Sequence, residues 1–476
     1  MRVTFLAAVI ALSACASPGP APATIPAPAI TKAERVFPDD AALLALIKAR
    51  VDDGRAAGIV LGVMEADGST RVIAYGDPGP GAQPLSANSV FEIGSITKVF
   101  TSTVLADMVQ KGEVKLDDPV QTYAPAGLTL PARNGKQITL RSLSEQNSGL
   151  PRMPTNFAPA DMTNPYVDYG ATQLNAFLSG HELTRDPGET FEYSNLGVGL
   201  LGHVLATKAG MGYEALVTQR ILKPLNMTMT GQTLSPSMQA ALAKGHGPTG
   251  ELAANWDMDV LAGAGGLRSN MTDMLKFLDA NLGEPKNDLE RAMRMAQQPS
   301  STAKGPKIGL NWITQDMPGG AKIVWHNGGT GGYGTYMGLD QKRGVGVVLL
   351  ANTSGVPQDI AMHLLDPASP LTPKPVEHTE IAVPTEKLMK FVGVYAMDAQ
   401  PDFQLKILVE NDQIIVAPTG QGQIRAFPEG ETPDGGLKVF HKVVDAQITF
   451  TPATDGKAAY LTLHQNGQNM KATKLP

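Results

Sequence analysis

A proline-rich segment divides the chain into two parts with different hydrophobic patterns, and this division constrains the fold more than any other feature. Residues 366–384 contain five prolines, at positions 367, 370, 373, 375 and 384. Proline lacks a backbone N–H and interrupts helices and central strands, so we predict a linker over residues 367–384. Residues 36–366 are then expected to form one domain and residues 385–476 another.

The hydrophobic pattern before the linker predicts both helices and strands. Apolar residues at helical spacing predict helices from an N-cap at Asp40 to Gly54, and over 96–109, 196–209 and 271–282. β-rich runs predict strands over 59–64, 71–75, 322–326, 334–339 and 345–351, the first two joined by a turn at Asp67-Gly68. Strands near both ends with helices between them predict an α/β (α+β) fold: a mixed antiparallel sheet flanked by helices, plus an α-rich part.

The pattern after the linker is that of a small all-β domain. Residues 403–409 alternate apolar and polar side chains, and turn dipeptides stand at Asn411-Asp412, Asp455-Gly456 and Asn466-Gly467. We predict an antiparallel, barrel-like β domain over residues 385–476.

The first residues have the pattern of an export signal. Arg2 is followed by an apolar run, Phe5 to Leu12, which is too short to span a bilayer. Leu12-Ser13-Ala14-Cys15 resembles a bacterial lipobox, and Cys15 is the only cysteine in the chain. We expect residues 1–15 to be a lipoprotein signal peptide with lipidation at Cys15, residues 16–35 to be a Pro/Ala-rich spacer, and the protein to face the periplasm from the outer membrane. The alternative is an ordinary signal peptide cut near Ala16.

Composition argues against several classes of function. The net charge is −6 and the basic residues are scattered, so nucleic acid is not an expected partner. The eight histidines show no paired ligand spacing, so we expect neither a metal nor another cofactor. The pattern does not indicate an oligomeric state.

Ser95-Ile-Thr-Lys98 opens the predicted buried helix over 96–109. Residues three apart share one helix face, and a serine hydroxyl needs a neighbouring base to become a nucleophile. A second copy of the spacing, Ser301-Thr-Ala-Lys304, stands between Pro299 and Pro306 and is expected in a loop. The first copy is therefore the candidate nucleophile and amine.

Two further segments carry candidate site residues. Tyr193-Ser-Asn195 precedes a predicted helix, and a tyrosine held beside a lysine could ionise below its usual pKa and act as a base. His326-Asn-Gly-Gly-Thr330 ends a predicted strand, and its glycines allow a ligand to approach the backbone. There, the N–H groups of Gly329 and Ser95 could stabilise an oxyanion. The alternative for Tyr193 is a half-buried aromatic residue without a catalytic role. The alternative for the His326 segment is a glycine-rich hairpin with a solvated histidine.

These motifs together resemble class C β-lactamases and their relatives, which include D-alanyl-D-alanine carboxypeptidases, D-amino-acid peptidases and β-lactamase-like esterases. The resemblance covers residues 40–355 and is carried by Phe91-Glu-Ile-Gly-Ser-Ile-Thr-Lys98, Gly112-Glu-Val-Lys-Leu-Asp-Asp-Pro119, Ser148-Gly-Leu-Pro151, Tyr193-Ser-Asn195, Ala264-Gly-Gly-Leu267 and His326-Asn-Gly-Gly-Thr-Gly-Gly-Tyr-Gly334. The tail resembles, more weakly, the lipocalin-like β domains appended to some of these hydrolases.

The resemblance implies a site and a reaction. Ser95 would attack the carbonyl, Lys98 and Tyr193 would move protons, and the substrate would be bound by Asn195, His326, Gly328, Gly329 and Thr330. The implied function is an exported serine hydrolase that forms an acyl-enzyme with a β-lactam or a D-amino-acid peptide amide, such as a peptidoglycan-derived substrate. A carboxylesterase with the same site and an inert envelope-binding protein are the alternatives.

Two positions depart from the pattern of the family. His326 occupies the place of the lysine in a Lys-Thr-Gly motif, and an imidazole near pKa 6.5 titrates in the working pH range. If it must be protonated to bind a substrate carboxylate, affinity should weaken from about pH 6 to 8. Gln146-Asn147 stands where relatives commonly have His-Thr.

Overall fold

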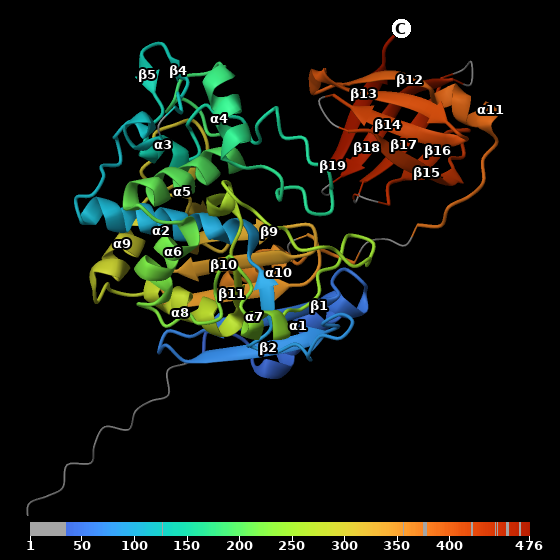
Figure 1. Ribbon diagram of the computed structural model, residues 1–476. Helices are drawn as coiled ribbons and strands as arrows, with labels where there is room; N and C mark the ends of the chain where they lie inside the picture. Colours follow the sequence, from blue (N-terminus) through green and yellow to red (C-terminus); the bar gives the residue numbers. More distant parts are fainter. Residues whose placement is uncertain are drawn as a thin grey trace, which may run out of the picture.

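The structure, a computed structural model, describes residues 35–476 except 126, 356, 375–377, 420–421, 443, 445, 454–456 and 466–467. The described residues form a mixed α/β part and a β-barrel (Figure 1). The proposed signal peptide with Cys15, and the turn dipeptides at 455–456 and 466–467, lie outside the described residues.

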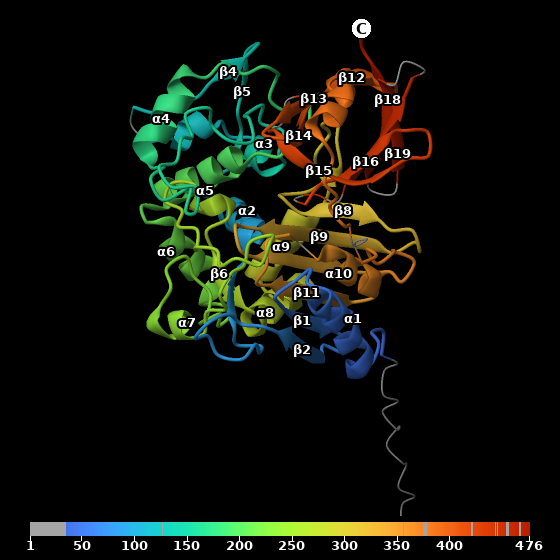
Figure 2. The ribbon, with the colours of Figure 1, turned by 90° about the vertical axis from the view of Figure 1, so that its right-hand side faces the viewer.

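A seven-stranded antiparallel sheet is the framework of the mixed part, in the order β2-β1-β11-β10-β9-β8-β7. The strands are β1 (Gly58–Met64), β2 (Thr70–Gly76), β7 (Lys307–Ile308), β8 (Ile313–Asp316), β9 (Lys322–Gly329), β10 (Gly334–Asp340) and β11 (Val345–Ala351). Figure 2 shows them stacked from β8 to β2. Strands from both ends of the region therefore meet in one sheet, as predicted.

Helices lie on both faces of this sheet. The helices of the mixed part are α1 (Asp40–Asp52), α2 (Thr97–Gln110), α3 (Leu140–Ser144), α4 (Ala171–Gly180), α5 (Asn195–Ala209), α6 (Tyr213–Val217), α7 (Pro236–Ala240), α8 (Met271–Asn281), α9 (Asp288–Gln297) and α10 (Gln358–Leu365). Of these, α1 and α10 lie against one face and α8 against the other. Successive strand residues point to opposite faces, so Ile59 and Leu61 of β1 pack in the core with α1 and α10, whereas Val60 packs in the core with α2 and α8. Two short sheets, β3 (Val90–Glu92) with β6 (Arg268–Asn270) and β4 (Ala132–Arg133) with β5 (Lys136–Gln137), complete this part.

The predicted helix starts and ends are close to those of the structure. The N-cap of α1 is Asp39, not Asp40, because the Asp39 carboxylate accepts the N–H of Ala42 at 2.9 Å. The buried helix over 96–109 consists of a 3-10 turn, η1 (Gly94–Ile96), that runs directly into α2. Ser95 therefore lies in the turn that leads into the helix, and Lys98 lies in the first turn of the helix.

The tail forms a closed barrel of eight strands that follow one another in sequence order. The strands are β12 (Gly393–Met397), β13 (Gln400–Glu410), β14 (Gln413–Pro418), β15 (Ile424–Glu431), β16 (Leu437–Phe440), β17 (Ala446–Pro452), β18 (Ala458–Gln465) and β19 (Gln468–Lys474), preceded by a short helix, α11 (Thr385–Leu388). Asn411 and Asp412, with φ of 49° and 60°, form the predicted β13–β14 turn. Apolar side chains, among them Tyr395 and Phe450, fill the interior.

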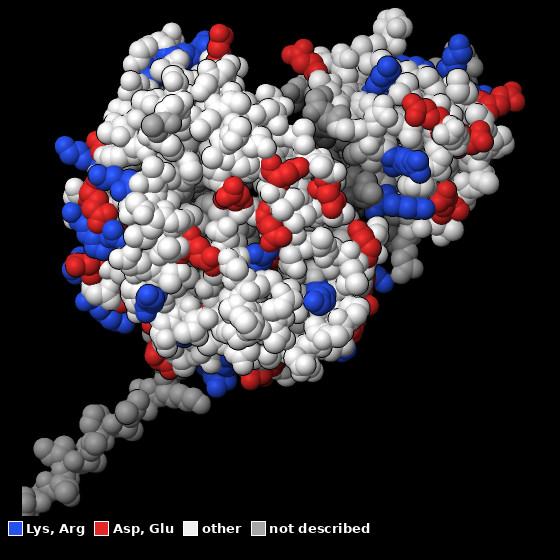
Figure 3. All heavy atoms as spheres, in the orientation of Figure 1, with Lys and Arg blue, Asp and Glu red and all other residues white. Residues whose placement is uncertain are grey.

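The barrel lies beyond the β8 end of the sheet, at the level of α3 and α4 (Figures 1 and 2). On the face shown in Figure 3, Lys and Arg are interspersed with Asp and Glu rather than gathered into one basic surface. Among the described residues no helix combines the length and the apolar character needed to cross a membrane.

Candidate active site

The structure brings Ser95 and Lys98 together at the N-terminal end of α2. The Nζ atom of Lys98 lies 3.0 Å from Oγ of Ser95, and the Lys98 side chain is fully buried. Ser95 is partly exposed, so its hydroxyl is accessible to a substrate while its partner is not. This is the geometry that a nucleophile and its base require.

Two further oxygens surround the amine of Lys98. They are Oδ1 of Asn195, at 2.9 Å, and the backbone carbonyl of Ala264, at 2.6 Å. Burial, together with the nearby charge of Arg152, lowers the pKa of Lys98 well below its usual value. A neutral amine has two hydrogens and one lone pair. Both oxygens can only accept, so the hydrogens go to them and the lone pair is left for the hydroxyl proton of Ser95.

Tyr193 and Asn195 stand at the start of α5. Ser194 caps this helix by accepting the N–H of Gly197 at 2.8 Å, and Asn195 is its first residue. The ring centroid of Tyr193 lies 4.8 Å from Nζ of Lys98 and 6.3 Å from the ring centroid of His326. The expectation that Tyr193 ionises below its usual pKa is wrong, because burial raises the pKa of Tyr193 to about 12. Its phenol therefore keeps its proton in the resting enzyme.

His326 lies on β9 and is almost completely buried, with 2% of its surface exposed. Its Nδ1 atom lies 2.6 Å from the carbonyl oxygen of Asn327, which can only accept, so the hydrogen of the neutral ring is on Nδ1. Burial, and the charge of Lys98, lower the pKa of His326 to about 3. The expectation that this imidazole loses a proton between pH 6 and 8 is therefore wrong, because the ring is already neutral at pH 6.

The glycines at the end of β9 allow this strand to approach the turn that holds Ser95. A Cβ on Gly328 would overlap the carbonyl oxygen of Ile93, and a Cβ on Gly94, which has φ of 49°, would lie 2.7 Å from the backbone nitrogen of Gly329. The backbone of Gly329 therefore lies against the residue that precedes Ser95. Thr330, predicted to hold substrate, donates its N–H to the carbonyl of Tyr333 at 2.9 Å and closes the β9–β10 connection.

The second Ser-x-x-Lys segment lies in a loop, as predicted. Ser301 Oγ accepts a hydrogen bond from Nδ2 of Asn147 at 3.0 Å, and the backbone N–H of Lys304 donates to the carbonyl of Glu189 at 3.1 Å. No helix brings these two side chains onto one face.

Sequence reasoning did not assign a role to three residues of the site. Ala264 supplies its carbonyl to Lys98 and belongs to the Ala264-Gly-Gly-Leu267 motif. Arg152 directly follows the Ser148-Gly-Leu-Pro151 motif. These two motifs are the sequence signals that point to the two residues. Gln146, noted only as a departure, accepts the N–H of Ser194 and donates to Oδ1 of Asn311, both at 2.7 Å. Its buried amide therefore holds the segment that carries Tyr193 and Asn195.

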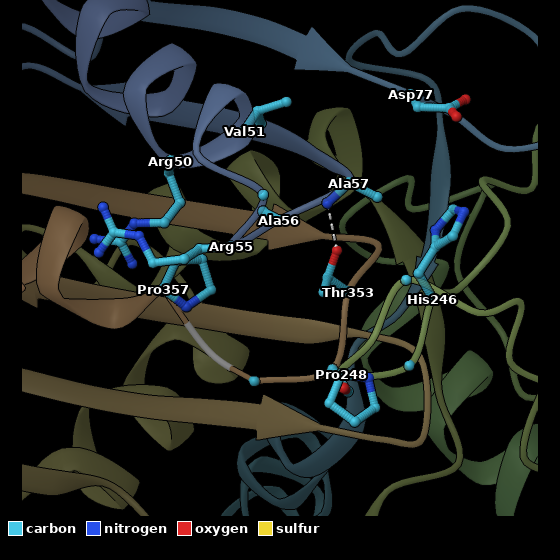
Figure 4. A pocket seen from close by; sticks show the side chains of 15 residues that line it. Arg50, Val51, Arg55, Ala56, Ala57, Asp77, His246, Pro248, Thr353 and Pro357 are labelled. Atoms are coloured by element: carbon cyan, nitrogen blue, oxygen red, sulfur yellow. Dashed lines mark hydrogen bonds between the residues drawn. The ribbon is translucent and has the colours of Figure 1, made fainter. Parts of the chain in front are cut away.

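A cavity of about 650 Å³ lies elsewhere, and none of the predicted site residues lines it (Figure 4). Two arginines stand at its wall, but Arg50 is paired with Asp359 and Arg55 with Asp53. Neither arginine is left as a free cation for a ligand.

Comparison with known proteins agrees with this geometry. A family model described as β-lactamase matches residues 43–366. The chain is 32% identical over 322 residues to the D-alanyl-D-alanine-carboxypeptidase/endopeptidase AmpH of Escherichia coli K12, covering 63% of this chain and 80% of AmpH. It is 27% identical over 330 residues to a β-lactamase of Pseudomonas fluorescens, covering 62% and 88%.

A solved structure of similar fold is the β-lactamase/D-alanine carboxypeptidase of Yersinia pestis, complexed with citrate. Its TM-score is 0.58 at 25% identity, covering 70% of this chain and 98% of that one. The family model accounts for more than half of the chain and includes the Ser95, Tyr193 and His326 segments. The chain therefore belongs to the β-lactamase family of serine hydrolases.

Proposed function

We propose that this protein is a serine hydrolase that cleaves a D-amino-acid peptide amide, with β-lactams as related acyl donors, through an acyl-enzyme on Ser95. The observation that carries the proposal is the buried amine of Lys98, 3.0 Å from the Ser95 hydroxyl and with two acceptor oxygens at its other positions. This arrangement supports a neutral lysine as the base that activates the nucleophile.

In the first step Lys98 takes the proton of Ser95 while Oγ forms a bond with the substrate carbonyl carbon. The N–H groups of Ser95 and Gly329 stabilise the resulting oxyanion, a role that the close approach of Gly94 and Gly329 supports. The carbon–nitrogen bond then breaks as Tyr193, a neutral phenol, gives its proton to the leaving nitrogen. The ammonium of Lys98 returns a proton to Tyr193.

In the second step water attacks the acyl-enzyme. Lys98, neutral again, takes a proton from the water as the water oxygen bonds to the acyl carbon. The ester bond to Ser95 then breaks, and the Lys98 ammonium gives that proton to the serine oxygen as the acid is released. Asn195 has its carbonyl oxygen on Lys98, so its amide N–H₂ group is the part that holds the substrate. His326, Gly328 and Thr330, at and just beyond the end of β9, would contact the substrate from the other side.

The peptide substrate class is supported by the similarity to AmpH, whose name states a carboxypeptidase and endopeptidase activity. A second candidate function, a carboxylesterase with the same site, is favoured by the neutral, buried His326, which provides no fixed charge for a substrate carboxylate. An inert binding protein is disfavoured because Lys98 keeps its contacts with both Ser95 and Asn195.

Intact-protein mass spectrometry tests the proposal after exposure to a penicillin, an activated ester and a D-alanyl-D-alanine peptide in turn. We expect covalent adducts on the wild type and none on Ser95→Ala, with turnover lower by on the order of 10³-fold or more. Ser301→Ala, at the loop copy of the motif, is the matched control and should be labelled like the wild type. Labelling of the ester alone would favour the esterase, and an adduct that survives in Ser95→Ala would contradict the assignment of the nucleophile.

We also propose an envelope location. Export through residues 1–15, lipidation of Cys15 and a spacer over residues 16–35 would hold the hydrolase near peptidoglycan-derived substrates, and Ala16 is not an acidic retention residue, which favours the outer membrane. Metabolic labelling with a fatty-acid analogue should tag the wild type, and Cys15→Ser should release the protein from the membrane fraction. An unlabelled wild type in the soluble fraction would refute the anchor.

A further inference from the structure

The two basic residues at the centre of the site do not offer a fixed positive charge to a substrate. Lys98 is fully buried and its amine is held by Asn195 and Ala264. His326 is buried against the Asn327 carbonyl and is neutral near pH 7. Acyl donors of the peptide and β-lactam classes carry a carboxylate close to the bond that is cleaved, and a carboxylate is bound most strongly by a charged donor.

Arg152 is a cation beside the ring of Tyr193. Its guanidinium carbon lies 5.2 Å from the ring centroid of Tyr193, the same ring that stands 4.8 Å from Nζ of Lys98. Its positive charge also lowers the pKa of Lys98, so the electrostatic effect of Arg152 reaches the centre of the site. The side chain is solvent-exposed and is therefore open to a ligand.

The backbone of Arg152 is fixed although its side chain is exposed. Its carbonyl accepts the N–H groups of Asn195, at 3.0 Å, and Leu196, at 3.2 Å. The preceding carbonyl, of Pro151, accepts the hydroxyl of Ser194 at 2.6 Å. The start of the Arg152 side chain is thus tied to the segment that carries Tyr193 and Asn195.

The guanidinium has no protein acceptor within the described part of the chain. Several other arginines of the mixed part form ion pairs, as Arg268 does with Asp257 and Arg220 with Glu113. Arg152 forms neither an ion pair nor a side-chain hydrogen bond with any described residue. A guanidinium presents several N–H donors in a planar fork that matches a carboxylate, and a ring contact holds it without using them.

We propose that Arg152 is a specificity-determining residue that binds the carboxylate of the acyl donor. This inference rests on the proposed function and narrows its substrate class to acyl donors with a free carboxylate beside the scissile bond.

The test compares two substrates that differ only in this charge: an N-acylated D-alanyl-D-alanine and the same compound with a C-terminal carboxamide. The readout is the ratio of their kcat/KM values. Arg152→Gln should lower the preference for the free acid by on the order of 10- to 100-fold, mainly through KM, because a charged hydrogen-bond partner is lost. Arg152→Lys should retain part of the preference, since lysine keeps the charge but not the fork.

Arg291→Gln is the matched control, since Arg291 is an exposed arginine on α9. It removes the same charge from the surface and should leave the ratio as in the wild type. The role of Arg152 would be overturned if Arg152→Gln kept the wild-type ratio of kcat/KM values, or if Arg291→Gln lowered that ratio equally. The acyl-enzyme proposal would stand in both cases. If the wild type cleaves neither compound but still forms the Ser95 adduct with an activated ester, the peptide substrate class fails and this inference fails with it.

Discussion

At the scale of single residues, burial determines the charge of His326. An imidazole in water has a pKa near 6.5. In the structure the ring is 2% exposed and close to Lys98, which lowers its pKa to about 3. The histidine is therefore a neutral, buried residue with a fixed tautomer.

This has a kinetic consequence. The apparent KM for a penicillin should change little between pH 6 and 8, because the pKa of His326 is lowered to about 3 and its ring is already neutral at pH 6. The measurement is KM against pH for a penicillin and for a neutral ester. A KM that rises toward pH 8 for the penicillin alone would show that His326 is protonated at pH 6 and binds the carboxylate.

His326 also makes stability depend on pH. In the unfolded chain the imidazole binds a proton below about pH 6.5, whereas in the folded chain it does so only near pH 3. Between these values the unfolded state binds more protons, so the free energy of unfolding falls as pH falls, by up to about 1.4 kcal/mol per unit. From pH 7.5 to pH 5 this contribution should amount to about 2 kcal/mol.

His326→Asn removes the titrating ring. Urea denaturation at both pH values, in wild type and variant, measures the effect as a difference of differences, so any general loss of stability in the variant cancels. The wild type should lose more stability toward pH 5 than the variant does. Equal losses would mean that His326 titrates at its ordinary pKa in the folded protein.

At the scale of elements, the sequence predicts local periodicity well and contacts between distant backbones poorly. Helices α2, α5 and α8, and strands β1, β10 and β11, follow from their apolar spacing and turn residues. The two-residue strand β7 and the pairing of β3 with β6 have too few residues to show a period. Ser95, Lys98 and Tyr193 could be chosen from motifs, whereas the Ala264 carbonyl and the Gln146 amide act through long-range contacts that no local pattern encodes.

The end of β9 offers a matched pair of glycines to test one such contact. A Cβ on Gly328 would overlap the Ile93 carbonyl, which is backbone and cannot move aside, whereas a Cβ on Gly329 has no heavy atom within 4 Å. Gly328→Ala should therefore force β9 away from the Ser95 turn, destabilise the protein by about 1–3 kcal/mol and reduce acylation.

Gly329→Ala is the control for stability and should stay within about 0.5 kcal/mol of the wild type. Thermal denaturation and the rate of penicillin acylation are the two readouts. Equal destabilisation by the two substitutions would show that the close approach of β9 to Ile93 does not require a glycine at position 328.

At the scale of the whole molecule, the two ends of the predicted linker over 367–384 are bound to different parts of the structure. One end forms hydrogen bonds with the mixed part and the other with the barrel. Arg55 binds the carbonyls of Thr372 and Pro373, at 2.8 and 3.1 Å, which attaches this end to the mixed part. The N–H of Ile381 donates to the carbonyl of Pro428 at 2.8 Å, which attaches the other end to the barrel. The segment between these attachments is therefore shorter than the proline pattern indicates.

The barrel should be a separate folding unit. Its apolar core contains only residues from the tail, from Val383 to Ala472, and the cores on the two faces of the sheet contain none of them. A chain truncated after Lys374 keeps both carbonyls that Arg55 binds and lacks the whole barrel. We expect the shortened chain to fold and to be acylated by a penicillin at a rate within a few-fold of that of the intact protein. Calorimetry should show two unfolding transitions for the intact protein and one for the shortened chain. A shortened chain that is folded but no longer acylated would mean that the barrel completes the active site, and a single transition in the intact protein would mean that the two parts unfold as one.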